Sequence, residues 1–280
     1  MISAVRAASL ASASLSVLAF AAPVMAEAAI DEGPTQVSEI VVTAERREAP
    51  LAATPLSLTV ASQPLLDGVG VRDIKDLQIL APGLIVASTS NQTFTTARIR
   101  GVGTVGDNPG VESSVGVMID GVYRPRNGAA LGDLGEVERV EVLKGPQATL
   151  FGKNTSAGVI NVVTAAPSFD ARMAGEATFG DYGTHGGSVS LTGPIVDEVL
   201  AGRLYVAARR RDGLYDVKIG EGPRTSTDDQ TEHYDTVRGQ LLWRATPNLT
   251  ARLTADWTQR DERCCVGVQL VTGATAPLLA

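Results

Sequence analysis

The sequence predicts a compact α+β domain followed by antiparallel strands of a transmembrane β-barrel, which is incomplete in this chain. Three features of the 280 residues predict it: an apolar leader, a central region that mixes short strands with a helical pattern, and a C-terminal region of long alternating segments. The formal net charge is −7 and no basic block occurs, so a nucleic-acid partner is not expected.

The N-terminus has the pattern of a secretory signal peptide. Arg6 precedes an apolar run rich in Ala and Ser, and Val24 and Ala26 are the small residues before a cleavage point. A membrane anchor is the alternative, but the run is shorter than the ~20 apolar residues that a membrane span requires. Cleavage after Ala26 would remove one positive side chain and no acid, so the mature chain would carry a charge of −8.

Residues 27–48 are predicted to be a flexible, acidic linker that contains one isolated strand-forming segment. The segment "EIVVTAERRE", residues 39–48, lies between the Gly33-Pro34 linker and Pro50. An isolated strand leaves its own backbone groups unpaired, so we expect it to add to the open edge of a partner's sheet. The alternative is a first strand of the domain that follows.

Residues 49–166 are predicted to form the α+β domain. The segments "PLSLTVA", "TTARIRGV", "SVGVMIDGVY", "VERVEVL" and "AGVINVVT" are typical of short strands. The segment "VRDIKDLQILAPGL" is predicted to be a helix, because Ile74, Leu77 and Leu80 recur at helical spacing before the Pro82-Gly83 stop.

Residues 167–280 are predicted to be the first strands of a transmembrane β-barrel. Segments of about ten residues with alternating polarity, joined by loops that are short on one side and long on the other, are typical of this architecture. The expected outward side chains include Leu204, Val206, Leu241, Trp243, Leu253 and Trp257, and the expected inward ones include Arg203, Arg238, Arg252 and Asp256.

Two glycine-containing motifs match nucleotide-binding patterns without their context. "GVGTVG", residues 101–106, reads G-x-G-x-x-G, but Asp107-Asn108-Pro109-Gly110 cannot begin the long helix that a pyrophosphate needs. "GKN", residues 152–154, lacks the preceding glycine and the following Ser or Thr of a phosphate loop. The only histidines, His185 and His233, lie in the barrel-like region, so a catalytic triad and a hydrolase are not expected.

The stretch "VERVEVLKGPQATLFGKNTSAGVINVVT", residues 137–164, is predicted to shape a backbone and to carry no covalent chemistry. Gly145 and Pro146 should turn the chain, Gly152 should permit a tight backbone, and Asn154 should cap or bridge peptide groups. The flanking strand puts Val140 on one face and Arg139 and Glu141 on the other. This predicts much buried polar surface.

Several of these segments together resemble TonB-dependent outer-membrane receptors. "SEIVVTAERRE" is similar to the energy-coupling box of that family, and "ARIRGVG", "VGVMIDGVY" and "VERVEVLKGPQATLFGKNTSAGVINVVT" are similar to segments of its plug domain. "GPIVDEVLAGRLYVAARRRDGLYDV" looks like the start of its barrel.

The resemblance implies a plug lodged in a barrel of about 22 strands, in the outer membrane of a Gram-negative bacterium. It implies uptake of a scarce ligand, most often a ferric siderophore or other metal chelate, powered by the inner-membrane TonB–ExbB–ExbD complex. No enzyme activity, covalent cofactor or resident metal is implied. The residues implied to bind TonB are Glu39, Ile40, Val41, Val42, Thr43 and Ala44.

Ligand contacts are expected in polar plug loops, at Ser90, Asn91, Gln92, Thr104, Asp107 and Asn108. The alternatives to chelate uptake are uptake of a saccharide or other organic nutrient, and a passive outer-membrane binding or adhesion protein without coupling. A passive binder has no use for an accessible strand at residues 39–48.

Two features depart from the complete pattern of the family. About five barrel strands are present of the expected ~22, so we expect residues 27–280 alone neither to insert stably nor to transport. The coupling box begins thirteen residues after the expected cleavage point, which leaves no room for an extra signalling domain. Cys264 and Cys265 are expected in an oxidising extracellular loop, with a vicinal disulfide and a partner beyond Ala280 both open.

Overall fold

The computed structural model describes residues 41–43, 49–88, 95–104, 111–125, 133–217, 225 and 227–263. The expected signal peptide, most of the linker, Cys264 and Cys265 lie outside these residues. All described residues belong to one unit, residues 40–280.

A five-stranded sheet, called the core sheet here, organises the α+β region in the order β3-β9-β10-β7-β8. Its members are β3 (Leu58–Ser62), β7 (Val115–Ile119), β8 (Val122–Tyr123), β9 (Val137–Lys144) and β10 (Gly158–Thr164). Strands β10 and β7 run parallel, and the other neighbours are antiparallel. The strands predicted in "PLSLTVA", "SVGVMIDGVY", "VERVEVL" and "AGVINVVT" are therefore confirmed.

The predicted helix over residues 71–84 is wrong. The longer helix, α1, spans Gln63–Val69, begins with Pro64 in its first turn and ends at Gly70 in a left-handed conformation. Residues 71–84 contain a 3₁₀ turn, η2 (Asp76–Ile79), before β4. The side chain of Asp73 accepts a hydrogen bond from the Asp76 amide, and that of Asp76 from the Arg72 amide, which favours turns over a continuing helix.

Smaller elements surround the core sheet. Strands β4 (Leu84–Ser88), β5 (Thr95–Ile99) and β6 (Val102–Gly103) form an antiparallel sheet, and β1 (Val41–Val42) pairs with β2 (Ala49–Pro50). A 3₁₀ turn, η1 (Leu51–Ala53), follows β2, and helix α3 (Ala148–Phe151) lies between β9 and β10. The main apolar core lies between the core sheet, α1 and the β4-β5-β6 sheet, and includes Leu66, Ile74, Leu77, Ile99 and Ile160.

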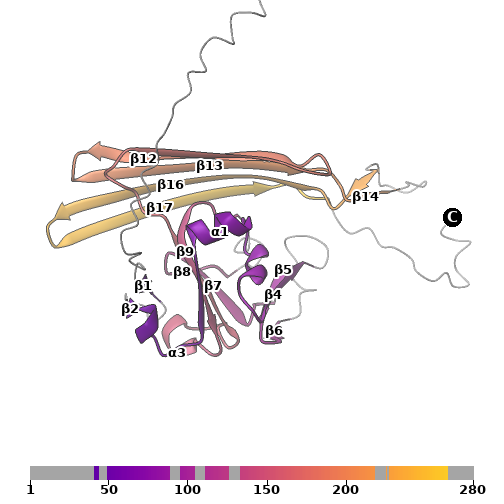
Figure 1. Cartoon of the computed structure of the whole chain (residues 1–280), viewed down its shortest axis with the longest axis horizontal. Helices are drawn as coiled ribbons and strands as arrows, with labels where there is room; N and C mark the ends of the chain where they lie inside the picture. The colour runs from indigo at the N-terminus through magenta and orange to yellow at the C-terminus, as the bar shows by residue number, and fades with distance from the viewer. Residues whose placement is uncertain are drawn as a thin grey trace, which may run out of the picture. The chain divides into compact units, whose positions relative to one another are not determined.

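The C-terminal region forms one antiparallel sheet, called the long sheet here, in the order β11-β12-β13-β16-β17. Its strands are β11 (Arg172–Phe179), β12 (His185–Val196), β13 (Leu200–Arg211), β16 (Glu232–Thr246) and β17 (Leu249–Arg260). The long connection after β13 carries the short pair β14 (Tyr215–Asp216) and β15 (Asp228–Asp229). Figure 1 shows the long strands side by side next to the α+β region.

The predicted phase of the long sheet is confirmed by its contacts with the α+β region. Arg238 donates to the Leu134 carbonyl oxygen at 3.1 Å, Arg252 donates to the Thr164 hydroxyl at 2.7 Å, and Asp256 pairs with Arg124 at 3.1 Å. Arg203 pairs with Glu136. The opposite face carries exposed apolar side chains, which include Leu204, Val206, Val237, Leu241, Trp243, Leu253 and Trp257.

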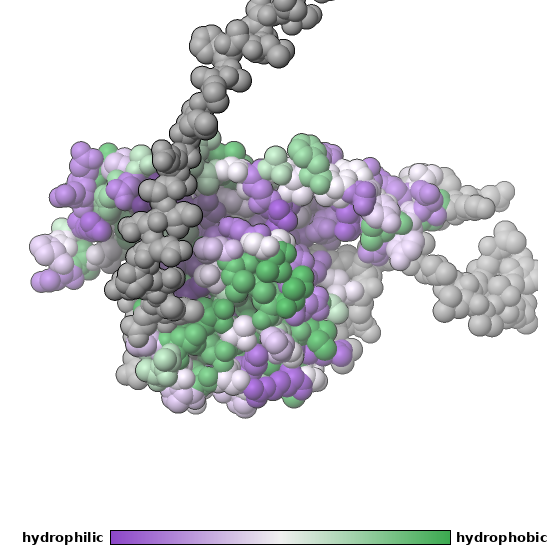
Figure 2. Space-filling view, in the orientation of Figure 1, coloured by the Kyte–Doolittle hydropathy of each residue, from purple (hydrophilic) through white to green (hydrophobic). Residues whose placement is uncertain are grey.

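The two regions distribute their polar residues differently. Figure 2 shows apolar residues gathered over the α+β region and a mixture of polar and apolar residues along the long sheet. Among the residues that the structure describes, no helix is long and apolar enough to cross a membrane.

Candidate functional site: a docked strand over a buried polar cluster

Three of the six residues expected to bind a partner strand lie within the described residues. Val41 and Val42 form β1, and Thr43 follows them, while Glu39, Ile40 and Ala44 lie outside the described part of the chain. Val41 pairs with Pro50 and Val42 with Ala49 in an antiparallel ladder. The expectation of an isolated strand is therefore wrong for these residues, and a role in pairing with a partner stays a prediction.

The side chain of Val42 anchors β1 to the core sheet. Val42 is 0% exposed, whereas its neighbour Val41 is 41% exposed. Val42 belongs to a second apolar cluster, whose other buried members are Met118, Leu143, Phe151 and Val159. Burial of a valine side chain contributes about 1.5–3 kcal/mol, so this contact helps to hold β1 against the sheet.

Thr43 continues the docking through polar contacts. Its backbone N–H donates to Oε1 of Glu141 at 2.8 Å, and its hydroxyl lies 3.2 Å from the same oxygen. The Asn161 amide donates to the Thr43 hydroxyl at 3.2 Å, and Arg139 Nη2 donates to it at 3.3 Å. We call Arg139, Glu141 and Asn161 the clasp.

Pairing in the core sheet places the clasp residues side by side. Glu141 lies directly opposite Asn161 in the β9–β10 ladder, and Arg139 is on the same face of β9, two residues from Glu141. Arg139 Nε donates to Glu141 Oε1 at 2.8 Å, and Asn161 donates to Glu141 Oε2 at 3.0 Å. Glu141 is 0% exposed and keeps a cationic partner, as a buried carboxylate requires.

The sequence carries signals that indicate only part of this cluster. The alternation of β9 predicted that Arg139 and Glu141 share a buried polar face. Asn161 interrupts the otherwise apolar segment "GVINVV", which is itself a sign of a hydrogen-bonded position. The contact of both strands with Thr43, about a hundred residues away in the chain, could not be read from the local pattern.

A cavity adjoins the clasp. It is distinct from a cavity of about 820 Å³ on the outward face of the long sheet. The cavity at the clasp has a volume of about 780 Å³ and lies between the α+β region and β17. Its lining includes Thr43, Asn161, Asp120, Arg124 and Asp256. Water in this cavity would reach the side of Thr43 that lines it.

The loop between β9 and β10 has the predicted glycine backbone angles, but Asn154 makes other contacts than predicted. Gly145 and Gly152 have φ values of 101° and 80°, which favour glycine, and Asn154 has a φ of 65°. The Asn154 amide donates to Glu112 at 2.6 Å and to the Tyr123 hydroxyl at 2.9 Å. Asn154 thus joins side chains rather than peptide groups.

Lys153 of the same loop lies 2.8 Å from Glu112. The hydrogen bond with Glu112 raises the pKa of Lys153, so this lysine stays charged and is not poised as a base. Among the described residues, no group of three or more His, Cys, Asp or Glu side chains is placed to hold a metal ion.

Of the residues expected to contact a ligand, Thr104 alone lies in the described part of the chain. Its hydroxyl donates to the Glu112 carbonyl oxygen at 3.1 Å and accepts from the Ser114 amide at 3.0 Å. Thr104 therefore joins two chain segments in this structure. Ser90, Asn91, Gln92, Asp107 and Asn108 lie outside the described residues.

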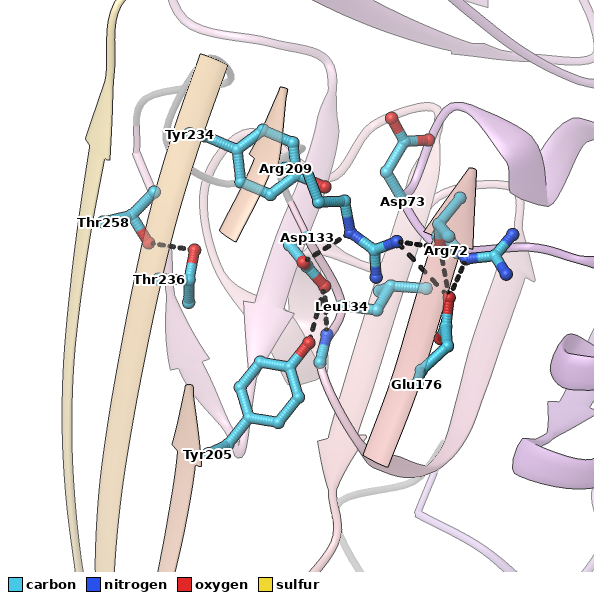
Figure 3. Close-up of polar contacts among 12 residues, drawn as sticks. Arg72, Asp73, Asp133, Leu134, Glu176, Tyr205, Arg209, Tyr234, Thr236 and Thr258 are labelled. Carbon is cyan, nitrogen blue, oxygen red and sulfur yellow. Dashed lines mark hydrogen bonds and ion pairs between the residues drawn. The ribbon is translucent and has the colours of Figure 1, made fainter. Parts of the chain in front are cut away.

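A second polar network joins the α+β region to the long sheet, as Figure 3 shows. Arg209 of β13 lies 3.5 Å from Asp133 and 3.5 Å from Glu176 of β11, and Arg72 contacts the same Glu176 at 2.7 Å. The Tyr205 hydroxyl lies 3.5 Å from Asp133. The opposite charges of sheet and α+β region therefore neutralise one another at this contact.

The comparisons with known proteins identify relatives of this chain. Residues 50–159 match the TonB-dependent Receptor Plug Domain family. The pesticin receptor of Yersinia pestis is 34% identical over 179 residues, which cover 63% of this chain and 26% of that receptor. The vitamin B12 transporter BtuB of Vibrio vulnificus is 34% identical over 134 residues, which cover 45% of this chain and 20% of that transporter.

Solved structures show the same fold. The crystal structure of the ferric yersiniabactin uptake receptor FyuA from Yersinia pestis superposes with a TM-score of 0.64 at 28% identity, over 74% of this chain and 32% of that one. The pyoverdine outer membrane receptor FpvA from Pseudomonas aeruginosa gives a TM-score of 0.65 at 21% identity, over 79% of this chain and 30% of that one.

A plug domain followed by an antiparallel sheet with its polar face toward the plug is the arrangement of a receptor family rather than of an enzyme family. Residues 50–159 belong to the TonB-dependent receptor plug family, and the chain corresponds to the N-terminal part of such a receptor. It spans about a quarter of the length of the pesticin receptor that it matches. This family membership places it in the outer membrane of a Gram-negative bacterium.

Proposed function

We propose that the complete protein takes up a scarce ligand across the outer membrane, a ferric siderophore or other metal chelate, using energy from the TonB–ExbB–ExbD complex. The observation that carries this proposal is the docked segment Val41–Thr43, a β-prone strand held on the plug beside an open cavity. A strand placed in this way can pair with the edge of a partner's strand after it leaves the plug.

The proposed cargo rests on the relatives. One solved structure, at 28% identity, is that of a ferric yersiniabactin uptake receptor, and further relatives are named as receptors for ferric enterobactin and ferrioxamine. A relative named as a vitamin B12 transporter supports the wider class of metal chelates. The ferric chelate is cargo here, and no resident cofactor is proposed.

Replacing Val41 by proline in the complete receptor tests the coupling role. Proline removes the backbone donor and fixes φ, so a partner strand cannot pair in register. Val42→Pro would do the same, but Val42 is buried and its loss would also disturb docking. Val41→Thr is the matched control, because threonine keeps the N–H and the strand propensity.

We expect iron-limited cells with Val41→Pro to lose uptake of ⁵⁵Fe-labelled siderophores while the receptor still binds them at the surface. The Val41→Thr control should transport normally. Normal transport by the proline variant, or equal transport in cells without the TonB complex, would overturn energy coupling and favour a passive binding protein. Uptake of labelled saccharides instead of iron chelates would overturn the cargo class.

A further inference from the structure

We propose that Glu141 is a positioning residue that keeps the coupling strand docked on the plug, so that docking and partner pairing exclude each other. The proposal deepens the proposed function and rests on it for the meaning of the strand.

Backbone groups of the coupling strand are already bound in the docked state. A partner strand that pairs along residues 41–43 needs the N–H groups of that segment. In this structure the Thr43 N–H is already bound to Glu141 at 2.8 Å, and β1 is already paired with β2 on one edge. The partner can therefore pair through Thr43 only after the hydrogen bond between the Thr43 N–H and Glu141 has broken.

The Glu141 carboxylate accepts hydrogen bonds at both of its oxygens. Its two oxygens receive donors from three residues: Thr43, Arg139 and Asn161. A carboxylate is the side chain that accepts at both oxygens, and hydrogen bonds to a charged acceptor are about twice as strong as neutral ones. Glutamine has the same shape but would turn an NH₂ group toward donors that now meet an oxygen.

The charges of the clasp are paired with one another. Glu141 is fully buried, and Arg139 binds both Glu141 and Glu138 through contacts in which Thr43 takes no part. Release of Thr43 therefore leaves no unpaired buried charge, because Arg139 and Asn161 keep Glu141 satisfied. The clasp can open and close again without unfolding the core sheet.

A cavity lies beside the clasp. Thr43 and Asn161 both line the cavity of about 780 Å³ between the plug and β17. Water from this cavity can replace the Thr43 hydroxyl at Glu141 and Asn161 when the strand leaves. Undocking thus requires removal of Val42 from its apolar cluster and exchange of Thr43 for water.

Alkylation of a cysteine at position 42 measures undocking directly. Val42→Cys keeps a small apolar side chain in the buried site, and a maleimide reagent reaches it only when the strand leaves the plug. The receptor is expressed from its complete gene in outer-membrane vesicles, with Cys264 and Cys265 replaced by serine. The labelling rate is compared with and without Glu141→Gln, in the absence of any cargo or partner.

We expect Glu141→Gln to raise the labelling rate at position 42 about tenfold, the effect of losing one charge-assisted hydrogen bond. Thr43→Val should raise it by a smaller factor, because the N–H contact remains, and Thr43→Ser should leave it unchanged. A cysteine at Ala97, which is buried in β5 away from the clasp, reports loosening of the whole plug.

An unchanged rate at position 42 in Glu141→Gln would overturn the proposal, as would a parallel rise at positions 42 and 97. The assay is independent of coupling. A selective rise at position 42 without any change in binding of the periplasmic domain of TonB would support the clasp and count against the coupling role of the strand.

Discussion

The plug and the long sheet both use strands of alternating polarity, but their apolar faces meet different surroundings. In the plug, the apolar face of β10 meets other protein, and Ile160 is 0% exposed. In the long sheet, the apolar face points away from the protein, and Leu253 of β17 is 65% exposed. The polar face of the long sheet meets the plug through side chains such as Arg238 and Arg252.

This difference shows that alternation alone does not say which face is buried in protein. An apolar outward face is stable only where lipid covers it, and an inward face rich in arginine is stable only where a polar partner neutralises it. The plug supplies those partners, for example Glu136 for Arg203 and Asp120 near Arg252. The polar surface of the plug and the polar face of the sheet therefore depend on each other.

The largest expected effect comes from a substitution that creates a cavity in the core of the plug. Ile160→Ala should destabilise the plug by about 2–5 kcal/mol, because the surrounding core cannot refill the space. Hydrogen–deuterium exchange of the β10 segment should become much faster. The matched variant Leu253→Ala in the long sheet should have a smaller effect, because lipid chains can fill the gap, and equal effects at both sites would contradict the lipid-facing assignment.

The next largest effect is expected from a charge introduced on the outward face of the long sheet. Leu253→Arg places a guanidinium among lipid chains at a cost of up to ~2–4 kcal/mol at mid-membrane depth. We expect less heat-modifiable, folded receptor in the outer membrane. Thr254→Arg is the control, because Thr254 is the next residue, faces inward and lines the cavity of about 780 Å³. The assigned phase would be wrong if the two arginine variants folded equally well.

A smaller effect is expected at Asp73, a plug residue next to the contact with the long sheet. Burial, and then the nearby Asp76 carboxylate, raise the pKa of Asp73 from 3.8 to about 6. A raised carboxyl pKa means that the folded plug binds the proton more tightly than the unfolded chain does. The stability from this group is complete below about pH 3.8, and it is lost as the pH rises through about 6.

Asp73→Asn should therefore stabilise the plug at pH 7 and leave its stability near pH 3.5 unchanged. The gain is at most roughly 2–3 kcal/mol, at about 1.4 kcal/mol per pKa unit. Asparagine still offers an oxygen to the Asp76 amide, so the local turn is kept. Exchange rates of residues 71–80, corrected for intrinsic pH dependence, measure the gain, and Asp67→Asn at an exposed position of α1 is the control. A variant that is less stable than the parent at pH 7 would contradict the direction of the pKa shift.

The sequence by itself determined the strands of the core sheet, the phase of the long sheet and the resemblance to the family. Period-two alternation fixed which side chains of β13, β16 and β17 share a face, because a strand turns each successive residue to the opposite side. The glycines at positions 145 and 152 likewise indicated a turn, since few other residues adopt their backbone angles. The segments of the plug carried enough specific residues to indicate TonB-dependent receptors.

Tertiary structure decided what local pattern could not. Helical spacing of Ile74, Leu77 and Leu80 predicted a helix, but the aspartate side chains at positions 73 and 76 bind backbone amides and fold the segment into turns. The segment at Val41–Thr43 read as an isolated strand, yet Val42 is buried in a cluster contributed by β7, α3, β9 and β10. Its partner Glu141 lies 98 residues away from Thr43, and only the folded core sheet brings that carboxylate, Asn161 and the strand together. Contacts between distant residues depend on how the whole chain packs, and a local pattern of polarity records only which face of an element is apolar.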